Sequence, residues 1–192
     1  ACAPHSLTDS LKEAEVLCEA RGGRLTPLRK KVLTLLLESD GPAKAYDLLG
    51  QMGCAVTMTP DSVTVAGPAD GRLRGIVADM ADCSDVAQTL AAVAVFASEP
   101  TEVTGIGFIR KKETDRIAAV VTELRRSGID ADETPDGFVI RPGQPKPTTI
   151  RTYDDHRMAM SFALLGTRVP GIAIADPECV AKTFPTYFDV LD

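Results

Sequence analysis

The amino-acid sequence predicts an α/β domain that follows a short all-helical segment. Before residue 50 the apolar residues recur at helical spacing, whereas after it short β-type runs alternate with helical runs. The charge changes at the same place, because residues 1–50 carry seven basic and seven acidic groups whereas residues 51–192 carry 14 and 20. The whole net charge of −6 therefore belongs to the second part. We predict two parts, residues 1–49 and residues 50–192.

Composition excludes several classes of protein. With 192 residues, 44% of them hydrophobic and 25% charged, the chain can bury a core. The acidic excess argues against a general nucleic-acid or membrane-surface binder, and no apolar run approaches the roughly 18 residues of a membrane span. We expect no secretory signal. Five scattered cysteines and two histidines favour a reduced, cytoplasmic protein and leave little material for a metal site.

The first part predicts three short helices. Apolar side chains at helical spacing define one helix over Leu11–Leu17 and another over Leu28–Leu36. Two glycines in RGGRLTP end the first helix, and Thr26 with Pro27 supplies a cap and a first-turn proline for the second. A third helix, AKAYDLL, follows a Gly-Pro break.

The second part predicts a repeated order of strands and helices. CAVTMT and SVTVAG form a hairpin, SDVAQTLAAVAVFA a helix capped by Ser84, and EVTGIGFI a strand. A helix in TDRIAAVVTELRRSG ends at Gly128, and IDADET pairs with GFVIRP as a second hairpin. A helix over 155–165, a buried strand GIAIAD and a short helix after Asp176 complete the chain. This order places helices on one face of a mixed sheet.

Basic side chains stand at three predicted helix starts. They are Lys112 with Arg116, His156 with Arg157, and Lys182. Because a helix N-terminus carries partial positive charge, a cation there is unfavourable by about 0.3–1 kcal/mol unless an anion binds. Free backbone N–H groups and fixed cations together form a phosphate or carboxylate site.

An alternative is that these cations form surface ion pairs. Arg116 would pair with Asp115 or Glu113, and Arg157 with Asp154 or Asp155. A single motif favours this interpretation, but three motifs within residues 112–182 favour a shared anionic ligand.

Two carboxylates are candidates for acid–base catalysis beside that ligand. They are Asp85 and Glu113. The position of Asp85, one residue after Ser84, is by itself more typical of a partner of the helix dipole.

Six segments of the second part resemble the C-terminal part of the EPSP synthase (3-phosphoshikimate 1-carboxyvinyltransferase) family. In order they are QMGCAV, DGRLRGIVADMADCSD, RKKETDRI, ELRRSG, YDDHRMAMSFAL and DPECVAKTFPTYF. The resemblance implies a partial inside-out α/β domain of about two βαβαββ units, whereas full-length members have two domains of three units with the active site between them. It also implies enolpyruvyl transfer from phosphoenolpyruvate to shikimate 3-phosphate in the shikimate pathway, without a cofactor.

The resemblance implies a role for each motif residue. Asp85 would contact the shikimate hydroxyls and accept a proton, and Glu113 would shuttle a proton at the enolpyruvyl carbon. Lys112 would face the shikimate ligand. The side chains that would hold the phosphoenolpyruvate carboxylate and phosphate are Arg116, Arg157 and Lys182, with His156 beside them. Phe108 departs from the pattern, because some members carry there an Asn whose shikimate contact is absent or supplied differently here.

Residues 8–49 resemble another family, the Fur-type regulators of the zinc-uptake branch. The segment EVLCEARGGRLTPLRKKVLTLLLESDGPAKAYDLL carries this resemblance to their N-terminal helices. The recognition helix, the wing and the zinc ligands do not follow, so Arg29, Lys30 and Lys31 are more typical of a solvated helix face. We interpret the chain as a chimera of a regulator start and a transferase tail. The alternatives to a transferase are a non-catalytic fragment and a metal-responsive DNA-binding regulator.

Overall fold

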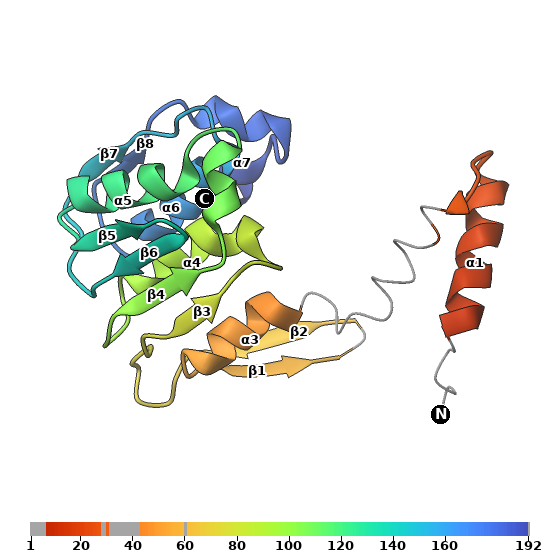
Figure 1. Ribbon diagram of the computed structural model, residues 1–192, viewed down its shortest axis with the longest axis horizontal. Helices are drawn as coiled ribbons and strands as arrows, with labels where there is room; N and C mark the ends of the chain where they lie inside the picture. The colour runs from red at the N-terminus through yellow and green to blue at the C-terminus, as the bar shows by residue number, and fades with distance from the viewer. Residues whose placement is uncertain (1–6, 28–29, 31–42, 60, 192) are drawn as a thin grey trace. The chain divides into compact units, whose positions relative to one another are not determined.

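The computed structural model describes residues 7–27, 30, 43–59 and 61–191. The chain divides into two compact units, Ala1–Lys44 and Ala45–Asp192 (Figure 1). Helix α3 (Ala43–Gln51) crosses this division, and its Leu48 belongs to the core of the second unit. The sequence-based boundary between residues 49 and 50 therefore falls inside a helix.

The first unit contains helix α1 (Leu7–Ala20). The helix ends as predicted at two glycines, because Gly22 adopts a φ of 72° and the N–H of Gly23 donates to the carbonyl of Cys18 at 2.8 Å. Lys30 donates to Glu15 at 2.7 Å. The predicted helix over Leu28–Leu36 lies, apart from Lys30, outside the described residues, as do Arg29 and Lys31.

The second unit begins with α3 and an antiparallel hairpin. Strands β1 (Ala55–Met58) and β2 (Val63–Ala66) pair with Met58 opposite Val63. Both the AKAYDLL helix and this hairpin confirm the sequence-based prediction. The side chains of the two strands are mostly exposed, whereas Met52 directly before them is fully buried.

A four-stranded mixed sheet forms the centre of the second unit, in the order β3-β4-β6-β5. Its strands are β3 (Val77–Asp79), β4 (Thr101–Thr104), β5 (Ala131–Thr134) and β6 (Gly137–Ile140). Helix α4 (Ala87–Ala94) connects the parallel pair β3 and β4, and α5 (Arg116–Arg126) leads to the antiparallel hairpin of β5 and β6. These elements make one complete βαβαββ sequence.

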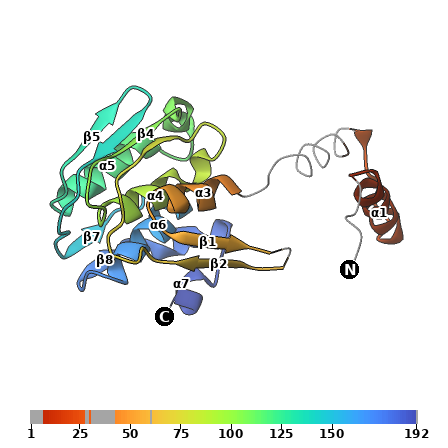
Figure 2. The same ribbon diagram turned by 90° about the horizontal axis from the view of Figure 1, so that it is seen from below.

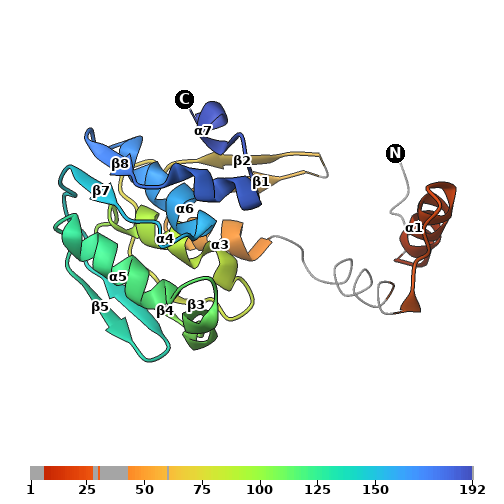
Figure 3. The ribbon, with the colours of Figure 1, turned by 90° about the horizontal axis from the view of Figure 1, so that it is seen from above.

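The chain then continues with a second, shorter set of the same kind. Strands β7 (Thr148–Ile150) and β8 (Ile172–Ile174) are parallel and are joined by α6 (His156–Gly166). A 3₁₀ turn, η3 (Pro177–Lys182), and helix α7 (Tyr187–Leu191) follow. Figures 2 and 3 show β7 and β8 at the outside of the unit, with α6 nearer its interior.

The core of the second unit lies around α4 and α6. Alanines give α4 a slim profile, so that α6 packs closely beside it, with Phe162 and Met158 fully buried. Thr89 of α4 and Ser161 of α6 share a hydrogen bond of 2.9 Å. Within the described ranges, no helix combines the length and the apolar character that crossing a membrane requires.

Three local predictions were wrong. Ser84 does not cap α4, because a 3₁₀ turn, η1 (Ser84–Val86), precedes the helix and neither start has a side-chain cap. The predicted strand EVTGIGFI ends at Thr104, because Gly105 adopts a φ of 76° and Gly107–Lys111 form a 3₁₀ turn. Strand β8 was expected to be buried but is half-exposed, because among the described strands only β7 pairs with it.

We expect Phe162→Ala to lower the free energy of unfolding by about 3–5 kcal/mol, because it leaves a cavity between α4 and α6. Urea denaturation measures the loss. Phe108→Ala is the matched control, since that ring is 52% exposed and its removal should cost less than about 1 kcal/mol. Equal losses for the two variants would contradict this assignment of the core.

Candidate functional site

A buried ion pair joins the starts of α5 and α6. Arg116, the first residue of α5, is only 2% exposed, and its Nε and Nη2 donate to the two carboxylate oxygens of Asp155 at 2.7 and 3.3 Å. Asp155 is fully buried and caps α6 by accepting the backbone N–H of Arg157 at 2.8 Å. Asp115 caps α5 in the same way, through the N–H of Ala118 at 3.0 Å. The pair therefore fixes two capped helix starts against each other.

A second layer of charged groups lies outside this pair. Nη2 of Arg116 donates to Glu113 at 2.8 Å, and Nζ of Lys182 donates to the other oxygen of Glu113 at 2.8 Å. Arg157 forms an ion pair with Asp85 at 2.9 Å and donates to the Asp85 carbonyl at 2.7 Å. Nη1 of Arg116 lies 3.7 Å from the Asp85 carboxylate. We call these six residues the charged cluster: Asp85, Glu113, Arg116, Asp155, Arg157 and Lys182.

The outer members of the charged cluster are open to solvent. The side chains of Asp85 and Lys182 are 60% and 62% exposed, whereas those of Glu113 and Arg157 are partly covered. A dissolved anion can therefore reach the exposed cationic groups from the solvent. The Arg116 guanidinium is held on its buried side by Asp155.

The charged cluster differs from both sequence-based interpretations. Three of the predicted cations lie together, as the first interpretation requires, but each pairs with a carboxylate rather than standing unpaired around an anion. Arg116 pairs with Glu113, as one alternative held, but not with Asp115, whose partner is Arg110. The Arg157 side chain pairs with Asp85 rather than with Asp154 or Asp155.

Two further candidate residues lie at the edges of the charged cluster. Lys112 follows the 3₁₀ turn η2 (Gly107–Lys111), is exposed, and forms no ion pair with any described residue. His156 is buried, and its Nδ1 lies 3.9 Å from Asp155 and has no hydrogen-bond partner among the described residues. Burial lowers the pKa of His156, so its imidazole is neutral near pH 7.

Glu113 is the carboxylate whose protonation the cluster controls most strongly. The hydrogen bond from Lys182 lowers the pKa of Glu113 to about 2, with further lowering by a backbone hydrogen bond and by Arg116. Glu113 is therefore ionised at neutral pH and is a weak proton acceptor while Lys182 holds it. A competing anion that takes Lys182 away raises the proton affinity of Glu113.

Backbone strain marks the segments that carry the cluster. Tyr153, Asp154 and Asp176, with φ of 57°, 56° and 48°, are the non-glycine residues with positive φ in the described part of the chain. They directly precede α6 and η3. Left-handed backbone is unfavourable for residues with a Cβ and is often found at functional sites.

The sequence pattern does not indicate Asp155 as the partner of Arg116. It predicts Asp155 as a surface partner of Arg157. The signal available was the Asp directly before a helix start in both KETDR and YDDHR, but pairing the two starts requires the tertiary structure.

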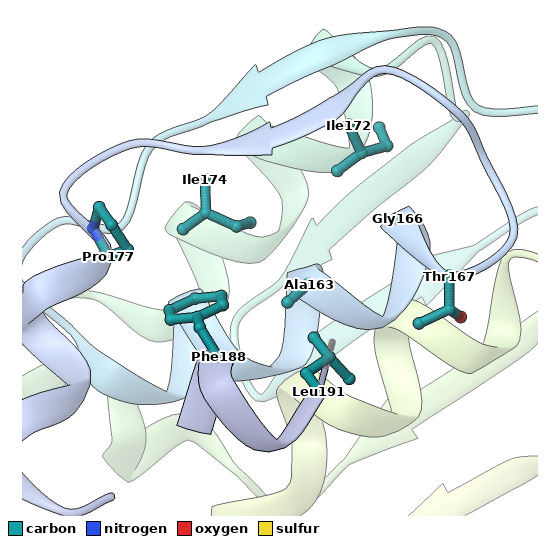
Figure 4. Close-up of a pocket in the computed structure, with 8 residues that line it drawn as sticks. All are labelled: Ala163, Gly166, Thr167, Ile172, Ile174, Pro177, Phe188 and Leu191. Carbon is teal, nitrogen blue, oxygen red and sulfur yellow. The ribbon is translucent and has the colours of Figure 1, made fainter. Parts of the chain in front are cut away.

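A cavity elsewhere in the second unit is chemically different. It measures about 570 Å³ and lies between α6, β8 and α7 (Figure 4). Its walls carry no charged side chain and are formed mainly by Ala163, Ile172, Ile174, Phe188 and Leu191. The cavity therefore offers an anionic ligand no charged partner, and we take the charged cluster as the candidate site.

Comparison with known proteins gives a consistent family. Residues 34–191 match the family described as EPSP synthase (3-phosphoshikimate 1-carboxyvinyltransferase). The 3-phosphoshikimate 1-carboxyvinyltransferase of Nostoc punctiforme is 55% identical over 142 residues, which are 74% of this chain and 33% of that protein. The chloroplastic protein of the same name from Brassica napus is 45% identical over 158 residues, covering 79% of this chain and 31% of that protein.

Solved structures agree with the fold. EPSP synthase from Acinetobacter baumannii superposes with a TM-score of 0.65 and 29% identity, covering 77% of this chain and 37% of that one. The enolpyruvyl transferase NikO from Streptomyces tendae, at 23% identity and a TM-score of 0.57, shows the fold alone. The predicted α/β fold of enolpyruvyl transferases is thus confirmed. The chain spans about a third of the length of the curated relatives it matches.

We expect the stabilising effect of Glu113 to disappear in acid. Because the folded pKa of about 2 lies below the ordinary 4.5, the contribution is complete above pH 4.5 and is lost as pH falls toward 2. Melting temperatures of the native protein and Glu113→Gln from pH 8 to pH 2 measure this. The native protein should melt higher at pH 7, and the gap should close in acid; a gap of constant size across the range would contradict the assignment.

Proposed function

Because the chain belongs to the EPSP synthase family, we propose that it carries one side of a site for enolpyruvyl transfer from phosphoenolpyruvate to shikimate 3-phosphate. The observation that supports this most strongly is the Arg116–Asp155 pair, which holds a guanidinium rigidly beneath Glu113, Arg157 and Lys182. Both substrates are polyanions, and arginine and lysine bind carboxylate and phosphate groups well.

Arg116, Arg157 and Lys182 would hold the phosphoenolpyruvate carboxylate and phosphate. They come from the starts of α5 and α6 and from η3, and so surround an anion from several directions. Because these cations already pair with Glu113 and Asp85, a bound anion must replace those outer contacts, while the buried Arg116–Asp155 pair stays intact. Lys182, 62% exposed and held only by Glu113 among the described contacts, is the easiest to redirect.

Glu113 and Asp85 would supply the proton transfers. In the reaction that the family implies, a shikimate hydroxyl adds to C2 of phosphoenolpyruvate while the methylene carbon takes a proton. Phosphate then leaves as that carbon returns a proton, which restores the enolpyruvyl double bond. Glu113 lies between Arg116 and Lys182, so an anion that draws Lys182 away raises its proton affinity when a donor is needed. Asp85, fixed by Arg157, would accept from the shikimate hydroxyl.

Lys112 and His156 would have supporting roles. Exposed Lys112 would reach the shikimate ligand, and buried, neutral His156 would lie beside the phosphoenolpyruvate groups without adding charge. Phe108, exposed on η2, stands where some members use an Asn. These assignments follow the motif resemblance and the positions in the fold.

The organisation of the chain supports a fragment or chimera as the second interpretation. Residues 1–49 would be the regulator-like segment and residues 50–192 the transferase part, although the family match already begins at residue 34. The Fur-type resemblance stays a prediction, since much of its segment lies outside the described residues. A cytoplasmic location also stays a prediction; no disulfide joins the four described cysteines, which is compatible with a reduced compartment.

We expect inorganic phosphate and phosphoenolpyruvate to stabilise the protein by mass action. With a Kd in the millimolar range, the gain at ~10 mM is about 1 kcal/mol. Arg157→Ala should remove most of the gain seen in thermal melts across a phosphate titration. Arg125→Ala is the matched control, because Arg125 also pairs with an exposed carboxylate, Asp132, but outside the charged cluster. The same phosphate response in all three proteins would contradict the proposed site.

We expect the 192-residue chain alone to show no measurable transferase activity. The reason is that catalysis needs simultaneous positioning by both walls of the cleft implied by the family, and this chain spans about 33% of a relative's length. Phosphate release from phosphoenolpyruvate with shikimate 3-phosphate measures it, beside the full-length Nostoc punctiforme relative. Turnover within about tenfold of that relative would contradict the prediction and would show that this chain completes the site without further residues.

A further inference from the structure

A fully buried carboxylate in α5 holds the segment that leads into the charged cluster. Glu123 accepts the Tyr153 hydroxyl on Oε1 at 2.7 Å and the backbone N–H of Arg151 on Oε2 at 3.0 Å. The guanidinium of Arg126 also donates to Oε2. Because an unpaired buried carboxylate is strongly unfavourable, these three donors compensate for the loss of water around the Glu123 carboxylate.

The contacts of Glu123 reach a strained stretch of backbone. Tyr153 and Asp154 both adopt left-handed conformations, with φ of 57° and 56°. Residues with a Cβ avoid this region unless surrounding contacts impose it. The Glu123 carboxylate supplies two such contacts, one at Arg151 and one at Tyr153. Burial and the Glu123 charge raise the pKa of Tyr153 to about 12, so its hydroxyl keeps the proton that it donates.

Arg116 and Glu123 hold the same segment at two points. They are seven residues apart and therefore lie on the same face of α5, about 10 Å from each other along its axis. Glu123 binds residues 151 and 153, and Arg116 binds Asp155. The strained residues, Tyr153 and Asp154, lie between the attachments at Arg151 and Asp155. They precede Asp155 and Arg157, which belong to the charged cluster.

We propose that Glu123, with Tyr153 as its partner, is a positioning residue for the anion site. By fixing Arg151 and Tyr153 it keeps the backbone in the conformation that places Asp155 beneath Arg116 and Arg157 beside Asp85. Among the described residues, the Glu123 side chain forms its hydrogen bonds with Arg126, Arg151 and Tyr153 and with no member of the charged cluster, so its effect on ligand binding is exerted through the backbone of residues 151–154. This inference rests on the proposed function, because the cluster is taken to bind substrate anions.

The competing interpretation is that Glu123 only stabilises the fold. A structural role lowers the melting temperature and leaves the affinity for phosphate unchanged, whereas a positioning role raises the phosphate Kd. Thr89→Val is the matched control, because it removes a partly buried hydrogen bond between α4 and Ser161 of α6 and none of the hydrogen bonds that Glu123 makes to Arg151 and Tyr153.

The test is the apparent Kd for inorganic phosphate, obtained from thermal melts of the full chain. Tyr153→Phe and Glu123→Leu should raise it by about three- to tenfold, the effect of losing one or two hydrogen bonds. Thr89→Val should lower the melting temperature without changing the Kd. Glu123→Gln should stay within about twofold of the native protein, because the Tyr153 hydroxyl can turn and accept from the amide. A native Kd in both Tyr153→Phe and Glu123→Leu would overturn the proposal.

A second measurement separates this inference from the proposed function. If the native chain shows no response to phosphate, the proposed anion site is contradicted, and the positioning is tested by hydrogen exchange. The Arg157 amide, which Asp155 accepts at 2.8 Å, should exchange about tenfold faster in Tyr153→Phe than in Thr89→Val. Equal exchange rates would overturn the positioning role whatever the ligand.

Discussion

The buried ion pair of Arg116 and Asp155 is the constraint on which the arrangement of the site depends. Two charges almost without solvent contact must stay together, since removing one partner of such a pair costs about 3–5 kcal/mol. The pair can form only where the starts of α5 and α6 face each other, and both starts are capped by aspartates. The outer side of the fixed Arg116 guanidinium is then occupied by Glu113, Arg157 and Lys182. The fixed position of the Arg116 guanidinium therefore sets where the exposed groups lie around it.

Electrostatic balance governs the charged cluster. Each of its cations has a carboxylate partner, so the cluster avoids the repulsion of three unpaired positive charges. In the proposed site, an arriving anion would exchange partners with the exposed groups while the buried pair stays intact. That exchange would couple anion binding to the proton affinity of Glu113, because Lys182 is the main cause of its low pKa. Binding and proton transfer would then be linked through one lysine.

The sheets show how the fold brings the site segments together. The central sheet is a complete βαβαββ arrangement, whereas β1 with β2 and β7 with β8 form two-stranded sheets. Small sheets of this kind have little stability of their own and depend on packing against helices. Helix α6 supplies that packing for β8, and its first turn carries residues of the cluster. The hairpin of β1 and β2 leaves Met58, Val63 and Val65 exposed, in a chain that spans about a third of its relatives' length.

The sequence by itself determined the class of the fold and indicated which charged residues belong to the candidate site. The signals that indicated them are local: period-two and helical runs of apolar residues, glycines at helix ends, and the KETDR, DDHRMAM and AKTFP motifs. Each depends only on residues close together in the chain, so it can be recognised in the sequence. Tertiary structure alone decided that Asp155, not Asp115, binds Arg116, that Arg157 turns to Asp85, and that Glu123 holds a strained segment 28 to 30 residues away. Those choices depend on which helix starts meet in space and which groups lose their water. Neither is encoded in the spacing of residues along the chain.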